Sequence, residues 1–234
     1  MYEPLSRPVA EGSRGQLSLR GIVKRFPGGI MANDAIDLDL RSHEVHALLG
    51  ENGAGKSTLM KILYGYYRAD EGSIAIDGQV VSIESPHQAR ELGIGMVFQS
   101  FMLIPALSVA ENVALWLQDC GRVISWRKVA ARVRAISEQY GFGINPHDKV
   151  WQLSIGDQQK IEILKLLLAE ARFLIFDEPT SVLVPQEVEA LFAIFRRLIA
   201  DGYTVVFITH KMREVLTIAD RVTVLRAGRV VGTV

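Results

Sequence analysis

The chain of 234 residues carries 26 basic and 26 acidic side chains, so its formal net charge is zero. Hydrophobic residues make up 49% of it and charged residues 22%, a balance that excludes a disordered chain. The zero charge argues against a partner held by phosphate neutralisation, so we expect no nucleic acid. Because Cys120 is the single cysteine, an intrachain disulfide is excluded. We expect a globular protein of a reducing cytosol.

Patterns of helix and strand alternate at both ends of the chain. Residues 1–15, rich in Pro, Gly, Ser and Arg, predict a flexible arm. Apolar patterns then predict, in order, strands 17–22, 35–40 and 45–49, helix 57–64, hairpin 74–83, a short helix from Pro86, and strand 94–98. Next come helical patterns over 108–140 and 155–169, strand 173–176, helix 185–199, strands 204–208 and 222–225, and a closing turn at 227–228. The order predicts an α/β fold with an inserted helical block, in which Trp116, Trp126 and Trp151 are expected to pack.

The strongest motif is a glycine-rich loop between strand 45–49 and the helix after it. It fits the pattern G-x-x-x-x-G-K-[ST] and consists of Gly50, Glu51, Asn52, Gly53, Ala54, Gly55, Lys56, Ser57 and Thr58. Glycines let backbone N–H groups approach an anion, and the helix adds its positive N-terminal end. Lys56 supplies a charge for the β- and γ-phosphates of a nucleotide, and Ser57 a hydroxyl for Mg²⁺. The alternative is a glycine-rich turn with an incidental lysine, which the flanking strand and helix disfavour.

A second motif is the apolar strand 173–176 followed by two acids, Asp177 and Glu178. Ligands of open parallel sheets bind at the carboxyl ends of the strands, where these acids would lie. Asp177 can hold Mg²⁺ through its hydration shell, and Glu178 is placed to orient or deprotonate an attacking water. Alternatively, the two acids cap a following helix.

Four further features make the sequence resemble the ATP-binding cassette (ABC) ATPases. Residues 153–159, L-S-I-G-D-Q-Q, are similar to the family signature L-S-G-G-Q. Gln99 follows strand 94–98 as the Q-loop glutamine of that family does, and His210 follows strand 204–208 as its switch histidine does. Phe26 lies where the family has an aromatic that stacks on adenine. Taken alone, Gln99 and His210 would be ordinary surface residues and Phe26 a core residue.

The resemblance implies a fold and a set of site residues. It implies a P-loop NTPase core with a mixed or parallel sheet, an N-terminal antiparallel β subdomain and an inserted helical subdomain. Residues 16–234 would form one cassette, with 16–99 and 171–234 as the nucleotide-binding core and 100–170 as the helical subdomain. The implied ligands are ATP and Mg²⁺. Glu178, His210 and Gln99 would act in hydrolysis, Ser57, Gln99 and Asp177 around Mg²⁺, and Ser154 and Gly156 on the ATP of a partner cassette.

A finer resemblance concerns residues 24–34 and 101–112, which are similar to the ATPase subunits of simple-sugar and nucleoside importers. It implies an ATP hydrolase bound to transmembrane permease subunits at the cytoplasmic face of the cell membrane. Such ATPases usually carry two cassettes in one chain, so we expect these residues to be the first cassette. The apolar run 101–107 is then either core or an exposed patch that receives a permease.

Ile155, Asp157 and Val184 depart from the family pattern. Ile155 replaces a signature glycine, Asp157 replaces its glutamine, and Val184 stands where many cassettes have an aspartate. Asp157 would repel a partner's phosphates unless it points away. We therefore expect Lys56, Asp177 and Glu178 to belong to a competent site that is completed by a signature outside this chain.

Two other classes of function remain as alternatives. One is a soluble cassette ATPase acting on ribosomes or nucleic acid. The zero charge disfavours it, as does the spacing of 121 residues between Lys56 and Asp177, which leaves no room for a long coiled-coil insertion. The other is a P-loop kinase or GTPase, which the motif at Ser154 and His210 disfavour.

Overall fold

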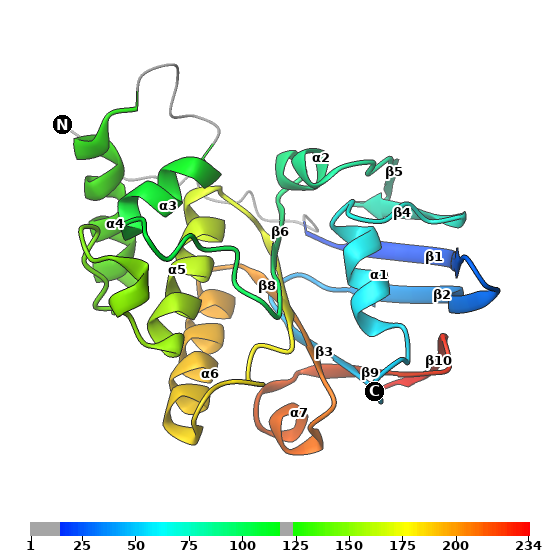
Figure 1. Ribbon diagram of the computed structural model, residues 1–234. Helices are drawn as coiled ribbons and strands as arrows, with labels where there is room; N and C mark the ends of the chain where they lie inside the picture. The colour runs from blue at the N-terminus through cyan, green and yellow to red at the C-terminus, as the bar shows by residue number, and fades with distance from the viewer. Residues whose placement is uncertain (1–14, 118–123) are drawn as a thin grey trace.

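The computed structural model describes residues 15–117 and 124–234, so residues 1–14 of the predicted arm and Cys120 lie outside the described residues. Two sheets carry the fold (Figure 1). The four-stranded sheet has the order β2 (Ile30–Leu40), β1 (Leu17–Phe26), β4 (Glu71–Ile76), β5 (Gln79–Val81). The six-stranded sheet has the order β10 (Arg229–Thr233), β9 (Arg221–Arg226), β3 (Val45–Leu49), β8 (Thr204–Thr209), β7 (Phe173–Asp177), β6 (Ile94–Val97).

The helices join and cover these sheets. They are α1 (Lys56–Leu63), α2 (Pro86–Glu91), α3 (Val109–Trp116), α4 (Trp126–Tyr140), α5 (Ile155–Leu168), α6 (Pro185–Ala200), α7 (Met212–Ile218) and a short 3₁₀ turn at Val150–Gln152. In Figure 1 the antiparallel sheet lies on the right and α3 to α6 lie on the left, with the six-stranded sheet running between them. Within residues 15–117 and 124–234, none of the helices has the length and apolar character needed to cross a bilayer.

The six-stranded sheet is parallel except for β10, which pairs antiparallel with β9. Every residue of β3, β6, β7 and β8 is buried. This explains why these strands are short continuous apolar runs, because layers cover both faces of a parallel sheet. The connections between parallel strands place all their carboxyl ends on one edge, which positions the loops described below.

The antiparallel sheet packs its apolar side against α1 and one face of the six-stranded sheet. In β1 and β2, Leu19 pairs with Leu38 and Ile22 with Ile36, and all four side chains are buried. Leu59 of α1 joins the same hydrophobic cluster. The helix that begins at Lys56 is thereby fixed from both sides.

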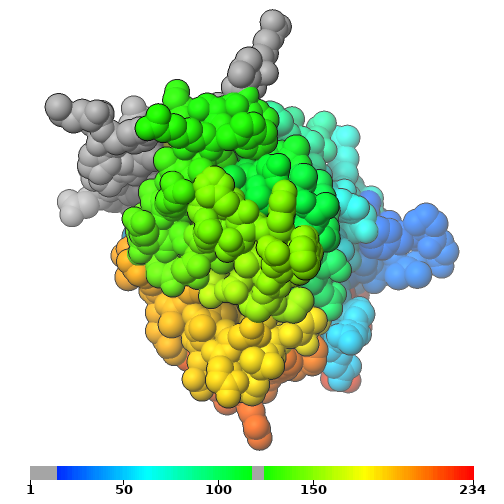
Figure 2. Space-filling view, turned by 60° about the vertical axis from the view of Figure 1, so that its left-hand side comes forward, coloured from blue at the N-terminus to red at the C-terminus, as the bar shows by residue number. Residues whose placement is uncertain are grey.

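Helices α3 to α6 pack on the other face of the six-stranded sheet. Ser108 and Glu111 form the predicted capping box at the start of α3. The buried surface of helix α5 is wider than the predicted apolar stripe. Glu162 and Lys165 are buried as well, at 4% and 2% exposed, and form an ion pair at 2.9 Å. Figure 2 shows the green helical block adjoining α6 on one surface. The subdomain boundaries at 100 and 170 stay predictions.

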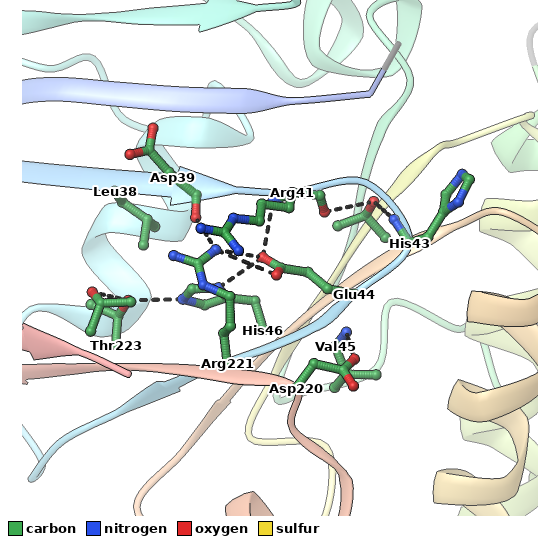
Figure 3. Close-up of polar contacts among 12 residues, drawn as sticks. Leu38, Asp39, Arg41, His43, Glu44, Val45, His46, Asp220, Arg221 and Thr223 are labelled. Atoms are coloured by element: carbon green, nitrogen blue, oxygen red, sulfur yellow. Dashed lines mark hydrogen bonds and ion pairs between the residues drawn. The ribbon is translucent and has the colours of Figure 1, made fainter. Parts of the chain in front are cut away.

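A buried polar network ties the two sheets together at the amino end of β3 (Figure 3). Glu44, 6% exposed, accepts from Arg221 at 3.0 Å and contacts His46 Nδ1 at 3.1 Å. His46 Nε2 lies 2.8 Å from the hydroxyl of Thr223, and Arg221 also donates to the Asp39 carbonyl of β2. Burial opposes the charge of Glu44, but the contacts with His46, Arg41 and Arg221 hold its pKa below the usual value.

The structure differs from the sequence-based predictions in two respects and gives a mixed answer to one open alternative. Helix α7 was not among the predicted elements. Trp126 and Trp151 are 51% and 65% exposed rather than packed in the helical block. The run 101–107 is mixed, since Leu103 packs against the core whereas Met102 is 60% exposed.

Candidate functional site

Except for Phe26, Ser154 and Gly156, the predicted site residues lie at the carboxyl ends of four adjacent parallel strands. The glycine-rich loop 50–58 starts directly after β3, and His210 follows β8, its neighbour. Asp177 ends β7, the next strand, and Gln99 lies two residues beyond β6. Strand order thus brings residues that are far apart in sequence to one edge of the sheet, where open α/β sheets bind ligands.

The shape of the loop requires glycine at two positions. A Cβ at Gly50 would collide with the carbonyl oxygen of Leu225, and one at Gly55 with that of Ala32. Gly55 also has a φ of +97°, a left-handed conformation that side chains disfavour. The turn between β9 and β10 supports the loop, since the Gly228 N–H donates to the Ala54 carbonyl at 3.2 Å. Of the remaining loop residues, Glu51, Asn52 and Gly53 are exposed and Thr58 is half-buried.

Lys56 folds back over this loop. Its Nζ donates to the carbonyls of Gly50 at 2.7 Å and Glu51 at 2.9 Å, and the residue is 5% exposed. Burial lowers the pKa of the Lys56 ammonium, and the charges of Glu178 and Asp177 oppose that shift. The loop therefore presents a cation surrounded by backbone groups, which suits a polyphosphate.

Ser57 and Asp177 form a pair of oxygen donors next to Lys56. The Ser57 hydroxyl donates to Asp177 Oδ1 at 2.8 Å, and Asp177 is 5% exposed. Burial raises the pKa of the Asp177 carboxyl, although the bond from Ser57 acts in the opposite direction. Hydroxyl and carboxylate oxygens are the ligands that Mg²⁺ prefers, so the pair fits that ion. Among the described residues, His, Cys, Asp and Glu side chains form no group of three or more that could hold a metal ion.

Glu178 lies between Gln99 and His210. Gln99 Nε2 donates to Glu178 Oε2 at 3.4 Å, and His210 Nδ1 is 3.6 Å from Glu178 Oε1. The side chain of Glu178 is 18% exposed and that of His210 45%, so water reaches this cluster. Glu178 has a φ of +49°, which is uncommon for a residue with a side chain and is found where surrounding contacts enforce it. The arrangement places a carboxylate where it can accept a proton from water.

Phe26 is half-buried at the end of β1. Its ring makes an edge-to-face contact with Tyr67 at a centroid distance of 5.3 Å, and Lys24 Nζ lies 5.8 Å from the ring centre. Among the described residues, no hydrogen bond or ring contact connects Phe26 to the glycine-rich loop. Its role toward adenine stays a prediction.

Ser154 and Gly156 lie at the start of α5, whose apolar residues belong to a different hydrophobic cluster from those of α1. Ser154 caps that helix by accepting from the Asp157 N–H at 3.1 Å. This end of α5 and the start of α6 line a pocket of about 190 Å³, and a Cβ at Gly156 would collide with the Glu187 carboxylate. Asp157 is held by Lys160 at 2.8 Å and by Ser154 at 2.9 Å. Lys160 and Ser154 thus pair with the Asp157 carboxylate, and its effect on a partner's phosphates stays a prediction.

Two buried polar residues near the site were not predicted from the sequence to be part of it. Asn33 of β2 is 0% exposed, and its side-chain amide donates to the Gly55 carbonyl at 3.1 Å. Glu214 of α7 is 8% exposed and bonds to Thr180 and Thr209. Asn33 lies within the stretch 24–34, but nothing in the sequence marked it or Glu214 as a site residue. Both residues reach the site because β2 and α7 pack beside the loops.

Comparison with known proteins decides the family. A family model described as ABC transporter matches residues 33–181, more than half of the chain. The chain belongs to the ABC transporter family. This match confirms the resemblance to ABC ATPases. It also confirms the predicted P-loop NTPase fold, in which helices pack on mixed sheets. Nucleotide binding is the shared property of such cassettes.

Relatives of this ABC chain are import proteins. It is 47% identical to the glucose import ATP-binding protein TsgD13 of Haloferax volcanii, over 93% of this chain and 45% of the relative. It is 45% identical to the nucleoside import ATP-binding protein NupA of Lactococcus lactis, over 91% of this chain and 42% of the relative. The chain therefore spans less than half the length of the curated relatives it matches.

Among solved structures, the ABC chain is similar to a bacterial ABC transporter cassette determined as a dimer. The TM-score is 0.80 at 26% sequence identity, and the match covers 93% of this chain and 97% of that one.

Proposed function

We propose that this chain binds and hydrolyses ATP and couples hydrolysis to the uptake of a small polar solute, such as a simple sugar or a nucleoside. One observation carries the proposal. A buried lysine in a glycine-rich loop, a serine–aspartate pair and a water-exposed glutamate share one edge of a parallel sheet. The named relatives are import proteins, which favours transport over the alternative of a ribosome or nucleic-acid ATPase.

In this proposal the residues 50–58 bind the polyphosphate. Lys56 exchanges its two carbonyl partners for phosphate oxygens, and backbone N–H groups of the loop complete the site. Ser57, Asp177 and Gln99 would hold Mg²⁺, which neutralises charge on the phosphates when bound. Phe26 would stack on the adenine.

The remaining residues act on water and on the γ-phosphate. Glu178 accepts the proton of the attacking water, Gln99 orients that water, and His210 donates a hydrogen bond to the γ-phosphate. The contacts of Glu178 with both neighbours support these roles, because a general base must lie within reach of the groups that orient its water.

A second cassette would complete the site. Helix α5, which has Ser154 and Gly156 at its start, and helix α1, which begins at Lys56, belong to different hydrophobic clusters. The signature of another cassette would therefore approach the ATP held here, and two nucleotides would be bound between two cassettes. The dimeric cassette of similar fold supports this arrangement. Transmembrane permease subunits would bind at the exposed side chains after Gln99, Met102 at 60% and Ile104 at 47%. The chain would then lie at the cytoplasmic face of the membrane as a peripheral subunit.

The test is a Glu178→Gln substitution in the full chain, with permease subunits and second cassette present. We expect ATP binding to persist while turnover falls about 10²- to 10⁴-fold, the usual contribution of a general base. The matched control is Glu189→Gln on the exposed side of α6, which should turn over ATP as the wild type does. Turnover near the wild-type rate in Glu178→Gln would reject the assignment.

A further inference from the structure

A single buried carboxylate joins the loops that follow β7 and β8. Glu214 of α7 is 8% exposed. Its Oε1 accepts from the Thr180 hydroxyl at 2.6 Å, and its Oε2 accepts from the Thr209 hydroxyl at 2.9 Å. Lys211 Nζ lies 3.1 Å from Oε1 and compensates the charge. Thr180 and Thr209 are 3% and 2% exposed, so both hydroxyls need an internal acceptor.

The two threonines flank the residues proposed to act in hydrolysis. Thr180 follows Glu178 by two positions, and Thr209 immediately precedes His210. Through these two side chains, Glu214 links the segment that carries Glu178 to the segment that carries His210, and the side chains of Glu178 and His210 lie 3.6 Å apart. A charge-assisted bond of this kind is short and directional, so it fixes geometry better than apolar packing does.

Glu178 needs such support because its backbone is strained. With a φ of +49°, it occupies the left-handed region, where surrounding contacts must hold it. On one side its N–H donates to the Ile208 carbonyl at 3.2 Å. On the other side Pro179 accepts from Gln159 of α5 at 3.0 Å, and Thr180 donates to Glu214. Lys211 adds a bond to the Thr180 carbonyl at 3.1 Å.

We propose that Glu214 is a positioning residue for hydrolysis, which sets Glu178 and His210 relative to each other through Thr180 and Thr209. The proposal rests on the proposed function, in which Glu178 and His210 act on water and phosphate. Glu214 touches neither ATP nor water in this role. Its removal should leave the glycine-rich loop intact and misplace Glu178, so it should lower kcat and spare the KM for ATP.

The experiment compares Glu214→Ala, Glu214→Gln and Thr209→Val in the full chain, under conditions where the wild type turns over ATP and each variant is folded. The matched control is Glu44→Gln, because Glu44 is also a buried carboxylate that bridges two elements. It lies at the amino end of β3, away from the strand ends that carry the proposed site (Figure 3). Steady-state kcat and KM and the thermal midpoint Tm are measured for each.

We expect Glu214→Ala to lower kcat about 10- to 100-fold, the scale of a small misplacement of reacting groups. The KM for ATP should change by less than about twofold, since ground-state contacts remain. Glu214→Gln, which keeps an oxygen acceptor, should recover part of the loss, and Thr209→Val, which removes one bond of the bridge, should lower kcat partially. Glu44→Gln should lower Tm and leave kcat unchanged.

A wild-type kcat in Glu214→Ala would overturn the proposal, and so would a loss of the same size in Glu44→Gln. If Glu214→Ala does not fold, Thr209→Val decides, and an unchanged kcat there overturns the proposal. The Glu178→Gln variant tests the proposed function separately. If this variant keeps its ATP turnover, both proposals are wrong. If Glu178→Gln loses turnover but Glu214→Ala keeps a wild-type kcat, only the positioning role of Glu214 is wrong.

Discussion

The Ser57 hydroxyl donates to Asp177 Oδ1 at 2.8 Å across 120 residues of sequence. This bond joins the start of α1 to the end of β7, past the intervening strand β8. Two residues predicted from separate motifs to serve the same cation are therefore adjacent. The contact connects the glycine-rich loop 50–58 with the loop that carries Glu178.

Replacing Asp177 by asparagine tests that connection. The asparagine amide would keep the shape and its oxygen could still accept from Ser57, but the change removes the carboxylate that suits Mg²⁺. We expect the dependence of ATP turnover on magnesium concentration to shift to higher concentration and kcat to fall, while Tm changes little. The measurement is a magnesium titration of turnover for Asp177→Asn beside the control Glu189→Gln. Identical titration curves for the two variants would contradict the role of Asp177.

Gly55→Ala should damage the phosphate loop. The added methyl group would collide with the Ala32 carbonyl, and the φ of +97° would become strained. We expect ATP binding to be lost and the free energy of unfolding to fall by about 1–3 kcal/mol, as for enforced backbone strain. Gly53→Ala is the informative comparison, since Gly53 shares a positive φ of 83° but faces open space. Calorimetric ATP titration and chemical denaturation measure both effects, and equal behaviour of the two variants would refute the steric argument.

The stability of the helical block should depend on pH through Glu111. Bonds from the Ser108 N–H and hydroxyl and from Lys149 lower the pKa of Glu111 from the usual 4.5 to about 2. A lowered pKa in the folded state stabilises the fold above the unfolded pKa, and the contribution is lost as pH falls through the folded pKa. The difference in unfolding free energy between wild type and Glu111→Gln should therefore be constant above about pH 5.5 and shrink toward pH 2.

Denaturant unfolding at a series of pH values between 7 and the acid limit of folding checks this dependence. Glu138→Gln on α4, whose side chain is exposed, supplies the control and should show no such change. If the difference in unfolding free energy between wild type and Glu111→Gln stays constant down to the acid limit of folding, the lowered pKa of Glu111 is contradicted.

Much of the fold follows from local patterns in the sequence. The strands β3, β6, β7 and β8 were predictable because strands buried on both faces are short apolar runs between turn residues. The hairpin of β4 and β5 was predictable from Asp77 and Gly78, which both adopt positive φ. Helix α7 was missed because it has seven residues and no side-chain cap, so neither periodicity nor a capping motif marks it.

The site was predictable only where it consists of motifs. Lys56 and Ser57 belong to one motif and Asp177 to another, and the structure brings them together. Asn33 and Glu214 reach the site from β2 and α7, and their contribution depends on tertiary packing that no local pattern encodes. The prediction that Trp126 and Trp151 pack in the helical block was wrong, because an aromatic residue in a helical segment can still face solvent.

The proposed function depends most directly on ATP binding through Lys56. Equilibrium titration of the full chain with ATP in the presence of magnesium measures it, with Lys56→Ala as the variant and Lys128→Ala, an exposed lysine of α4, as the control. We predict saturable binding by the wild type and by Lys128→Ala, and its loss in Lys56→Ala. Equal binding by all three proteins, or no binding by the wild type at millimolar ATP with the second cassette supplied, would contradict the proposed function.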